Sequence, residues 1–112
     1  MSQTNVISTK YIKETEASIQ IRHYKNNRTA LQLVGPSGEL LLTATVNLPH
    51  EELPDNQVFI KNYAENTGIL TVLQEKKIIK LVDRQVMSGF VWLDVAELRP
   101  TTDWLLPYED HR

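Results

Sequence analysis

The residues best suited to recognise another molecule lie where a short apolar run, residues 58–60, meets the expected start of a helix. Four side chains of mixed polar chemistry follow that run: Lys61, Tyr63, Glu65 and Asn66. They offer hydrogen-bond donors and acceptors of both charge signs at a rigid junction, and such chemistry suits recognition of a protein. The segment also suits a structural role, with an asparagine as helix cap and Glu65 near the positive end of the helix dipole. Both interpretations stay open.

A second candidate surface interleaves basic and aromatic side chains within residues 22–28. Its members are Arg22, Tyr24, Lys25 and Arg28. Aromatic rings that stack on bases, together with cations that neutralise phosphates, would form a nucleic-acid-binding module. Charged side chains are also a common guard against unwanted pairing at a strand edge. We keep nucleic-acid binding as the alternative to protein binding.

The two tryptophans have different surroundings in the sequence. Trp104 stands near the carboxyl end and is a candidate anchor for a protein partner or a clamp that holds the tail to the domain. Trp92 lies between Val91 and Leu93, in a run that is apolar on both faces. We therefore expect Trp92 to lie in the core.

Signatures of catalysis and of cofactor binding are missing from the sequence. His50 and the two glutamates after it lack the second histidine of a zinc-protease helix, and prolines on both sides prevent a long helix there. The four glycines are too dispersed for a phosphate-binding loop, and the chain has no cysteine. We predict a non-enzymatic protein without cofactor or metal. An enzyme whose site is assembled from His50, Glu51, Glu52 and Tyr63 is a further alternative.

Composition and charge limit the class of protein. The chain has 112 residues, of which 41% are hydrophobic and 23% charged, and these values are typical of one folded domain. Its formal net charge of −2 does not favour nucleic acid as a partner. The first residues lack the pattern of a signal peptide, and no apolar run has the length needed to cross a bilayer. We expect a cytoplasmic protein with no membrane partner.

The apolar periodicity predicts the elements that position these residues. We expect residues 1–16 to form a polar N-terminal arm and residues 17–112 to form a single α+β domain. Period-two alternation predicts a three-stranded meander over residues 18–24, 29–34 and 39–47, and a surface loop follows. Ile69, Val72 and Leu73 form the apolar stripe of a helix, and two β-rich runs follow it. These elements predict an antiparallel sheet of about five to six strands with one central α-helix packed on one face.

Residues 59–70, with a continuation to Leu73 and to Ile78 and Ile79, resemble part of a family of small uncharacterised domains encoded by bacteria, phages, plasmids and other mobile elements. Members carry a similar helix start of the form aromatic–Lys…Tyr–x–Glu–Asn–x–Gly, which corresponds here to Phe59, Lys61, Tyr63, Glu65, Asn66 and Gly68. The resemblance covers about a fifth of the chain and brings no catalytic residue. It implies a bacterial or phage accessory protein, and some such proteins inhibit host complexes.

Together these observations predict a small protein-binding accessory or inhibitor protein whose protein partner is unidentified. A homodimer formed through an uncovered sheet edge is a further alternative, because an unpaired strand can pair with a second copy.

Overall fold

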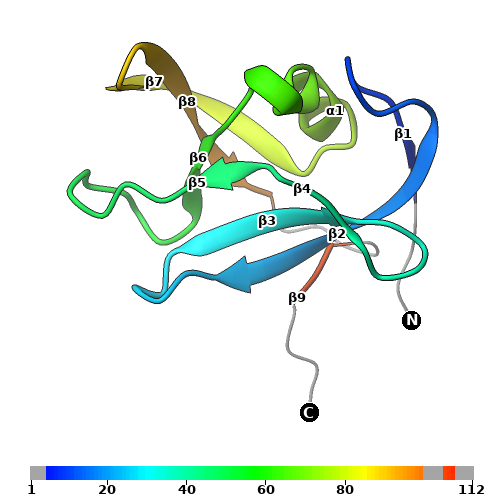
Figure 1. Cartoon of the computed structure of the whole chain (residues 1–112). Coiled ribbons are helices and arrows are strands. Elements are labelled where there is room, and N and C mark those ends of the chain that lie inside the picture. The colour runs from blue at the N-terminus through cyan, green and yellow to red at the C-terminus, as the bar shows by residue number, and fades with distance from the viewer. Residues whose placement is uncertain (1–4, 100–104, 108–112) are drawn as a thin grey trace.

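A computed structural model describes residues 5–99 and 105–107, and this part of the chain forms two mostly antiparallel sheets and one short α-helix (Figure 1). In chain order, its elements are β1 (Asn5–Ile7), β2 (Thr15–His23), β3 (Thr29–Val34), β4 (Leu40–Thr43), β5 (Thr45–Val46), β6 (Gln57–Ile60), a 3-10 turn η1 (Ala64–Asn66), α1 (Ile69–Glu75), β7 (Ile79–Ser88), β8 (Val91–Leu98) and β9 (Leu105–Pro107).

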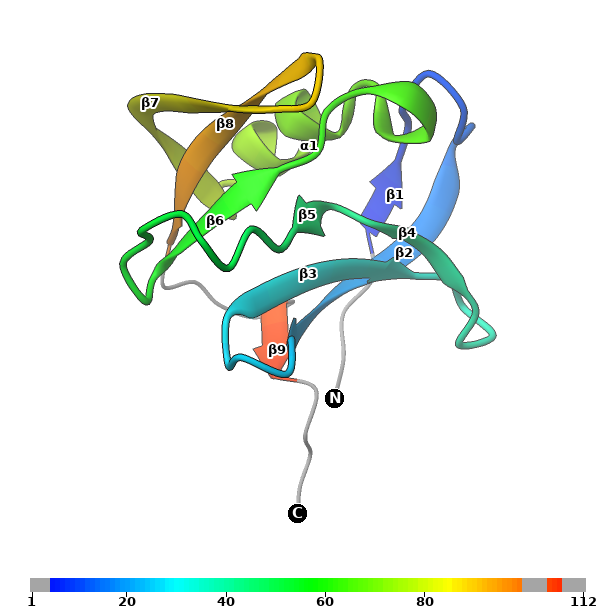
Figure 2. The ribbon, with the colours of Figure 1, turned by 60° about the vertical axis from the view of Figure 1, so that its left-hand side comes forward.

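The two sheets meet where the chain passes from β4 to β5. The first sheet has the order β1-β2-β3-β4, with β9 parallel to β2, and the second has the order β5-β6-β8-β7. Ala44 separates β4 from β5: its N–H donates to Leu31 of β3, and its carbonyl oxygen accepts from Lys61 after β6, both at 2.8 Å. The chain therefore leaves one sheet and enters the other at Ala44. In Figure 2, β5 accordingly lies between β3 and β6.

The helix α1 packs between the end strand of the first sheet and the end strand of the second. Figures 1 and 2 both show α1 between β1 and β7, the strands at opposite ends of the combined strand order. Ile69, Val72 and Leu73 are buried, and they share one apolar cluster with residues from both sheets, among them Leu31 and Ile60. Burial of this apolar stripe stabilises a helix that is too short to form alone.

The second sheet is buried on both faces near its centre. Val58 and Ile60 of β6 point into the main cluster, whereas Phe59 between them points the other way. Phe59 belongs to a second cluster with three residues of the β7–β8 hairpin: Val86, Leu93 and Val95. Leu48 and Leu53 of the loop formed by residues 47–56 pack against this cluster, so that loop covers the outer face of the sheet.

The comparison with the predicted fold is mixed. The α+β class, the antiparallel pairing of β2, β3 and β4 and the buried stripe of the helix are confirmed. The third predicted strand, residues 39–47, is instead divided at Ala44 into β4 and β5, which belong to different sheets. The prediction of about five to six strands in one sheet is wrong, because the described residues form nine strands in two sheets. The expected packing of the helix on one face is also wrong, since α1 packs into a core that both sheets share.

Part of the predicted N-terminal arm belongs to the folded body. Asn5 and Ile7 pair with Ala17 and Thr15, so β1 extends the first sheet, and Ile7 is only 2% exposed. The backbone N–H of Lys10 also donates to the carbonyl of Thr67 beside the helix, at 3.1 Å. A strand of three residues within a polar segment has too little periodicity to be recognised from the sequence.

Candidate functional site

The predicted recognition segment is held in place by its two asparagines. The side-chain oxygen of Asn62 accepts hydrogen bonds from the N–H groups of Gly68, at 3.1 Å, and Leu70, at 2.9 Å. Asn62 therefore caps the start of α1, although it stands six residues before Gly68 in the sequence. Gly68 adopts φ 100° at this position, a conformation that favours glycine.

Asn66 is a structural residue rather than a surface one. Its side chain is 1% exposed, and its amide nitrogen donates to the carbonyl oxygen of Thr43 at 2.7 Å. This bond ties the 3-10 turn to the end of β4, next to the bend at Ala44. Because the side chain points inward, Asn66 is not available to a partner at the surface.

Lys61, Tyr63 and Glu65 do come together at the surface, but they interact with one another. The Lys61 Nζ atom lies 2.6 Å from the Glu65 Oε2 atom and 5.5 Å from the centre of the Tyr63 ring. The hydrogen bond from Lys61 lowers the pKa of the Glu65 carboxyl. Tyr63 is half-buried against the second cluster. This group is thus an internally satisfied polar surface.

The basic and aromatic residues of the β2–β3 hairpin also contact the protein itself. The two terminal nitrogens of Arg28 donate to the carbonyls of Leu48 and Glu51, at 2.6 Å each, and so hold the 47–56 loop. The Tyr24 hydroxyl bonds to Thr45, and Arg22 donates to the Gln20 side chain at 3.0 Å. Lys25 is exposed in the turn. Arg22, Tyr24 and Arg28 thus have partners within the protein, and nucleic-acid binding by this hairpin stays a prediction.

Trp104, the remaining predicted anchor, lies outside the described residues, so its role stays a prediction.

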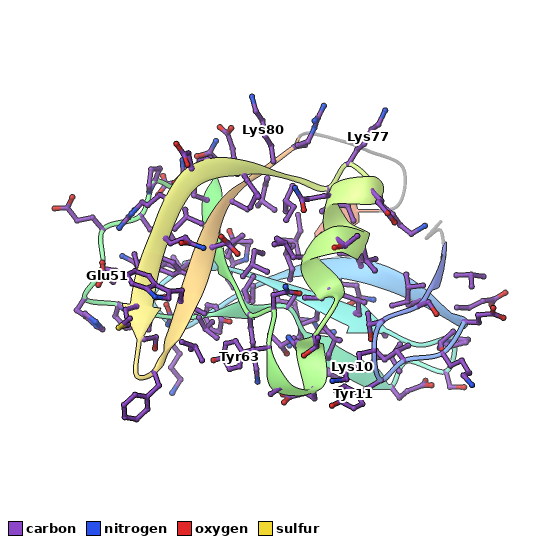
Figure 3. All side chains as sticks on the ribbon, turned by 90° about the horizontal axis from the view of Figure 1, so that it is seen from above. Lys10, Tyr11, Glu51, Tyr63, Lys77 and Lys80 are labelled. Atoms are coloured by element: carbon purple, nitrogen blue, oxygen red, sulfur yellow. The ribbon has the colours of Figure 1, made fainter. Side chains whose placement is uncertain are left out.

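A different group of residues stands out in the structure. We define the hairpin apolar surface as Met87, Phe90 and Trp92, which are 50%, 103% and 59% exposed. Met87 and Trp92 face each other across β7 and β8, and Phe90 lies in the turn that joins these strands. The closed end of the hairpin projects away from α1 in Figure 3. Large apolar side chains grouped on a protruding element are characteristic of interaction sites.

The expectation that Trp92 lies in the core is wrong. By strand alternation Trp92 shares a face with Asp94 and Ala96, and Ala96 is buried in the main cluster. The hairpin extends beyond that cluster, so the same face is covered at Ala96 and exposed at Trp92. One signal was present in the sequence: the polar Asp94 two residues after Trp92 indicates that this face leaves the core.

A pocket of about 480 Å³ lies beside the hairpin apolar surface. It is lined by Leu81, Asp83, Arg84, Gln85, Asp94 and Val95. Gln85 and Asp94, which line the pocket, form the next cross-strand pair on the same face as Met87 and Trp92, so the pocket lies beside the apolar surface along the hairpin. A bulge in β7 between Leu81 and Gln85 widens the hairpin at this point, and Asp83 within it has φ 62°.

The described residues hold no group of three or more histidine, aspartate or glutamate side chains that could bind a metal ion. Within the same part of the chain, no helix is long and apolar enough to cross a membrane.

The fold and the exposed hairpin define a small α+β protein with an uncovered apolar surface. No protein-family model matches this chain, and no curated protein or solved structure is significantly similar to it.

Proposed function

We propose that this chain is a non-enzymatic protein-binding protein, and that its binding surface is the hairpin apolar surface. The observation that carries the proposal is the full exposure of Phe90 next to the half-exposed Met87 and Trp92. Exposed apolar side chains oppose solubility, so a cluster of them at one place indicates a surface that a partner covers. Tryptophan, phenylalanine and methionine are also enriched at the centres of protein interfaces.

The scaffold beneath this surface is suited to binding. On the opposite face of the hairpin, Val86 pairs with Leu93, and both are buried in the second cluster. Met87 and Trp92 therefore project from strands whose other face is fixed by packing. A rigid surface loses less conformational freedom on binding, so more of the contact energy contributes to affinity.

The polar group formed by Lys61, Tyr63 and Glu65 is not part of the proposed binding surface. Its Tyr63 packs against the second cluster, which lies on the hairpin face opposite Met87 and Trp92. The proposal therefore assigns binding to the hairpin apolar surface alone. The role of a bacterial or phage accessory or inhibitor protein, which the family resemblance implies, is part of the same proposal.

Quantitative affinity purification from a bacterial lysate tests the proposal. Three forms of the chain are compared by mass spectrometry: the wild type, the double variant Phe90→Ser with Trp92→Ser, and the control double variant Lys61→Ala with Glu65→Ala. We expect a protein that the wild type and the control retain and the hairpin variant loses. Thermal unfolding measured by circular dichroism establishes that each variant is folded. A partner that all three forms retain equally would contradict the assignment of the hairpin.

A further inference from the structure

We propose that the partner presents a lysine or arginine side chain next to an apolar one, and that the cation enters the pocket beside Asp94 while the apolar side chain packs on Trp92. This inference rests on the proposed protein-binding function and adds the chemistry of the partner to it.

The geometry places the two halves of such a site side by side. Trp92 and Asp94 are two residues apart on β8, on the same face, which corresponds to about 7 Å along a strand. Their cross-strand partners, Met87 and Gln85, repeat that spacing on β7. A basic residue and an apolar residue one or two positions apart in a partner would therefore reach the pocket and the tryptophan together.

The charge of the pocket favours a cation. Asp83 and Asp94 bring two carboxylates to its lining, and one oxygen of Asp94 accepts a hydrogen bond from the neutral Gln85 side chain at 2.8 Å. Acidic groups beside an apolar surface attract a basic partner and orient it as it docks.

Arg84 also lines this pocket, but its guanidinium is directed to the 47–56 loop. One nitrogen donates to the carbonyl of Glu52 at 2.9 Å, and another lies 3.6 Å from the carboxylate of Glu51. Glu51 offsets part of the charge of Arg84, and the pocket lining sets the two carboxylates of Asp83 and Asp94 against this one cation. The pocket therefore keeps an acidic character.

The size of the pocket and the exposed ring are consistent with the same ligand. A volume of about 480 Å³ accommodates a long side chain with some water, and one wall is the aliphatic side chain of Leu81. The stem of lysine or arginine packs well on apolar surface while its charged end stays solvated. The face of the Trp92 ring adds cation–π attraction for a cation that passes over it.

The test uses a random peptide library displayed on phage, selected against the full-length chain. We expect the selected peptides to share a lysine or arginine within two positions of an aromatic or aliphatic residue. One such peptide is then synthesised, and its affinity is measured by fluorescence anisotropy for the wild type and for variants. The double variant Asp83→Asn with Asp94→Asn should bind about fivefold more weakly, and the difference should shrink at high salt.

The control Glu75→Gln removes a carboxylate at the end of α1 and should bind the peptide as the wild type does. Purely apolar peptides that bind the wild type and the Asp83→Asn, Asp94→Asn variant equally would overturn this inference and leave the protein-binding function standing. The protein-binding function and this inference would both be overturned if no peptide were selected. They would also be overturned if the double variant Phe90→Ser with Trp92→Ser bound the peptide as tightly as the wild type does. A dimer of the chain that light scattering detects and that Trp92→Ser dissociates would identify a second copy as the occupant, and would likewise overturn this inference.

Discussion

The polar segment at residues 61–66 and the hairpin apolar surface differ in how far their side chains are satisfied within the molecule. In the first region Lys61 pairs with Glu65, and Asn66 bonds to Thr43 inside the protein. In the second, Phe90 is fully exposed and Met87 and Trp92 are about half exposed. Residue types that are suited to recognition can instead form hydrogen bonds and ion pairs within the folded protein. A binding surface is better indicated by side chains that the fold leaves uncovered.

The largest expected effect is a difference in the free energy of unfolding between variants of the buried face of the hairpin and variants of its exposed end. Leu93→Ala removes a side chain that is completely buried in the second cluster, and we expect it to lower the free energy of unfolding by about 2–5 kcal/mol. Phe90→Ala, three residues away, should change it by less than about 0.5 kcal/mol because the ring makes no buried contact. Urea denaturation measures both values. A similar loss in the two variants would mean that Phe90 is packed in solution.

The next effect tests whether Asn66 is structural. Asn66→Ala removes the buried amide that donates to the partly buried carbonyl of Thr43, and we expect a loss of about 1–3 kcal/mol of unfolding free energy. Its exposed neighbour supplies the control, since Glu65→Ala should leave the free energy of unfolding nearly unchanged. If Asn66→Ala were as stable as the wild type, Asn66 would return to the list of candidate recognition residues.

The cap formed by Asn62 gives a smaller effect. Asn62→Ala removes the acceptor for two N–H groups at the start of α1, and we expect a loss of about 0.5–2 kcal/mol. Asn62→Asp keeps an acceptor oxygen and should recover most of that loss. Thermal unfolding followed by circular dichroism compares the three forms. Equal loss in both variants would show that the amide nitrogen, rather than the oxygen, matters.

The smallest effect concerns the pair of Lys61 and Glu65. The hydrogen bond from Lys61 lowers the pKa of Glu65 below its ordinary value of 4.5 in the folded protein. The pair therefore contributes to stability above pH 4.5, and this contribution is lost as the pH falls through the lower, folded pKa. Glu65 is exposed, so the contribution is small.

Titration of the Glu65 carboxyl by NMR measures this shift directly. In Lys61→Met we expect the pKa of Glu65 to rise towards 4.5, because the variant removes the hydrogen bond and the charge but keeps a chain of similar length. An unchanged pKa would show that the two side chains do not pair in solution.

Local pattern was sufficient to predict the elements whose periodicity is long and regular. The β2-β3-β4 meander and the stripe of Ile69, Val72 and Leu73 were both predicted from alternation or helical spacing. The short strand β1 and the bend at Ala44 were not, because pairing with distant segments creates them. The same limit explains the helix, which packs where two sheets meet rather than on one sheet.

The candidate site was harder to predict from the sequence than the fold. Trp92 stands in a run that reads as core, and its exposure depends on how far the hairpin extends beyond the body of the protein. The sequence around Arg28 favours a cation that contacts phosphate, yet its guanidinium donates hydrogen bonds to two carbonyls of the 47–56 loop. In both cases the decisive fact is a tertiary contact, or the lack of a covering element, that no local pattern encodes.

Site-specific photo-crosslinking tests the central claim most directly. Benzoylphenylalanine replaces Phe90 in one form of the chain and Glu65, an exposed residue of the polar segment, in a matched form. After irradiation in bacterial cells, we predict a crosslink to a second protein from position 90 and none from position 65. A crosslink from position 65 alone, or none from position 90, would contradict the assignment of the hairpin as the binding surface.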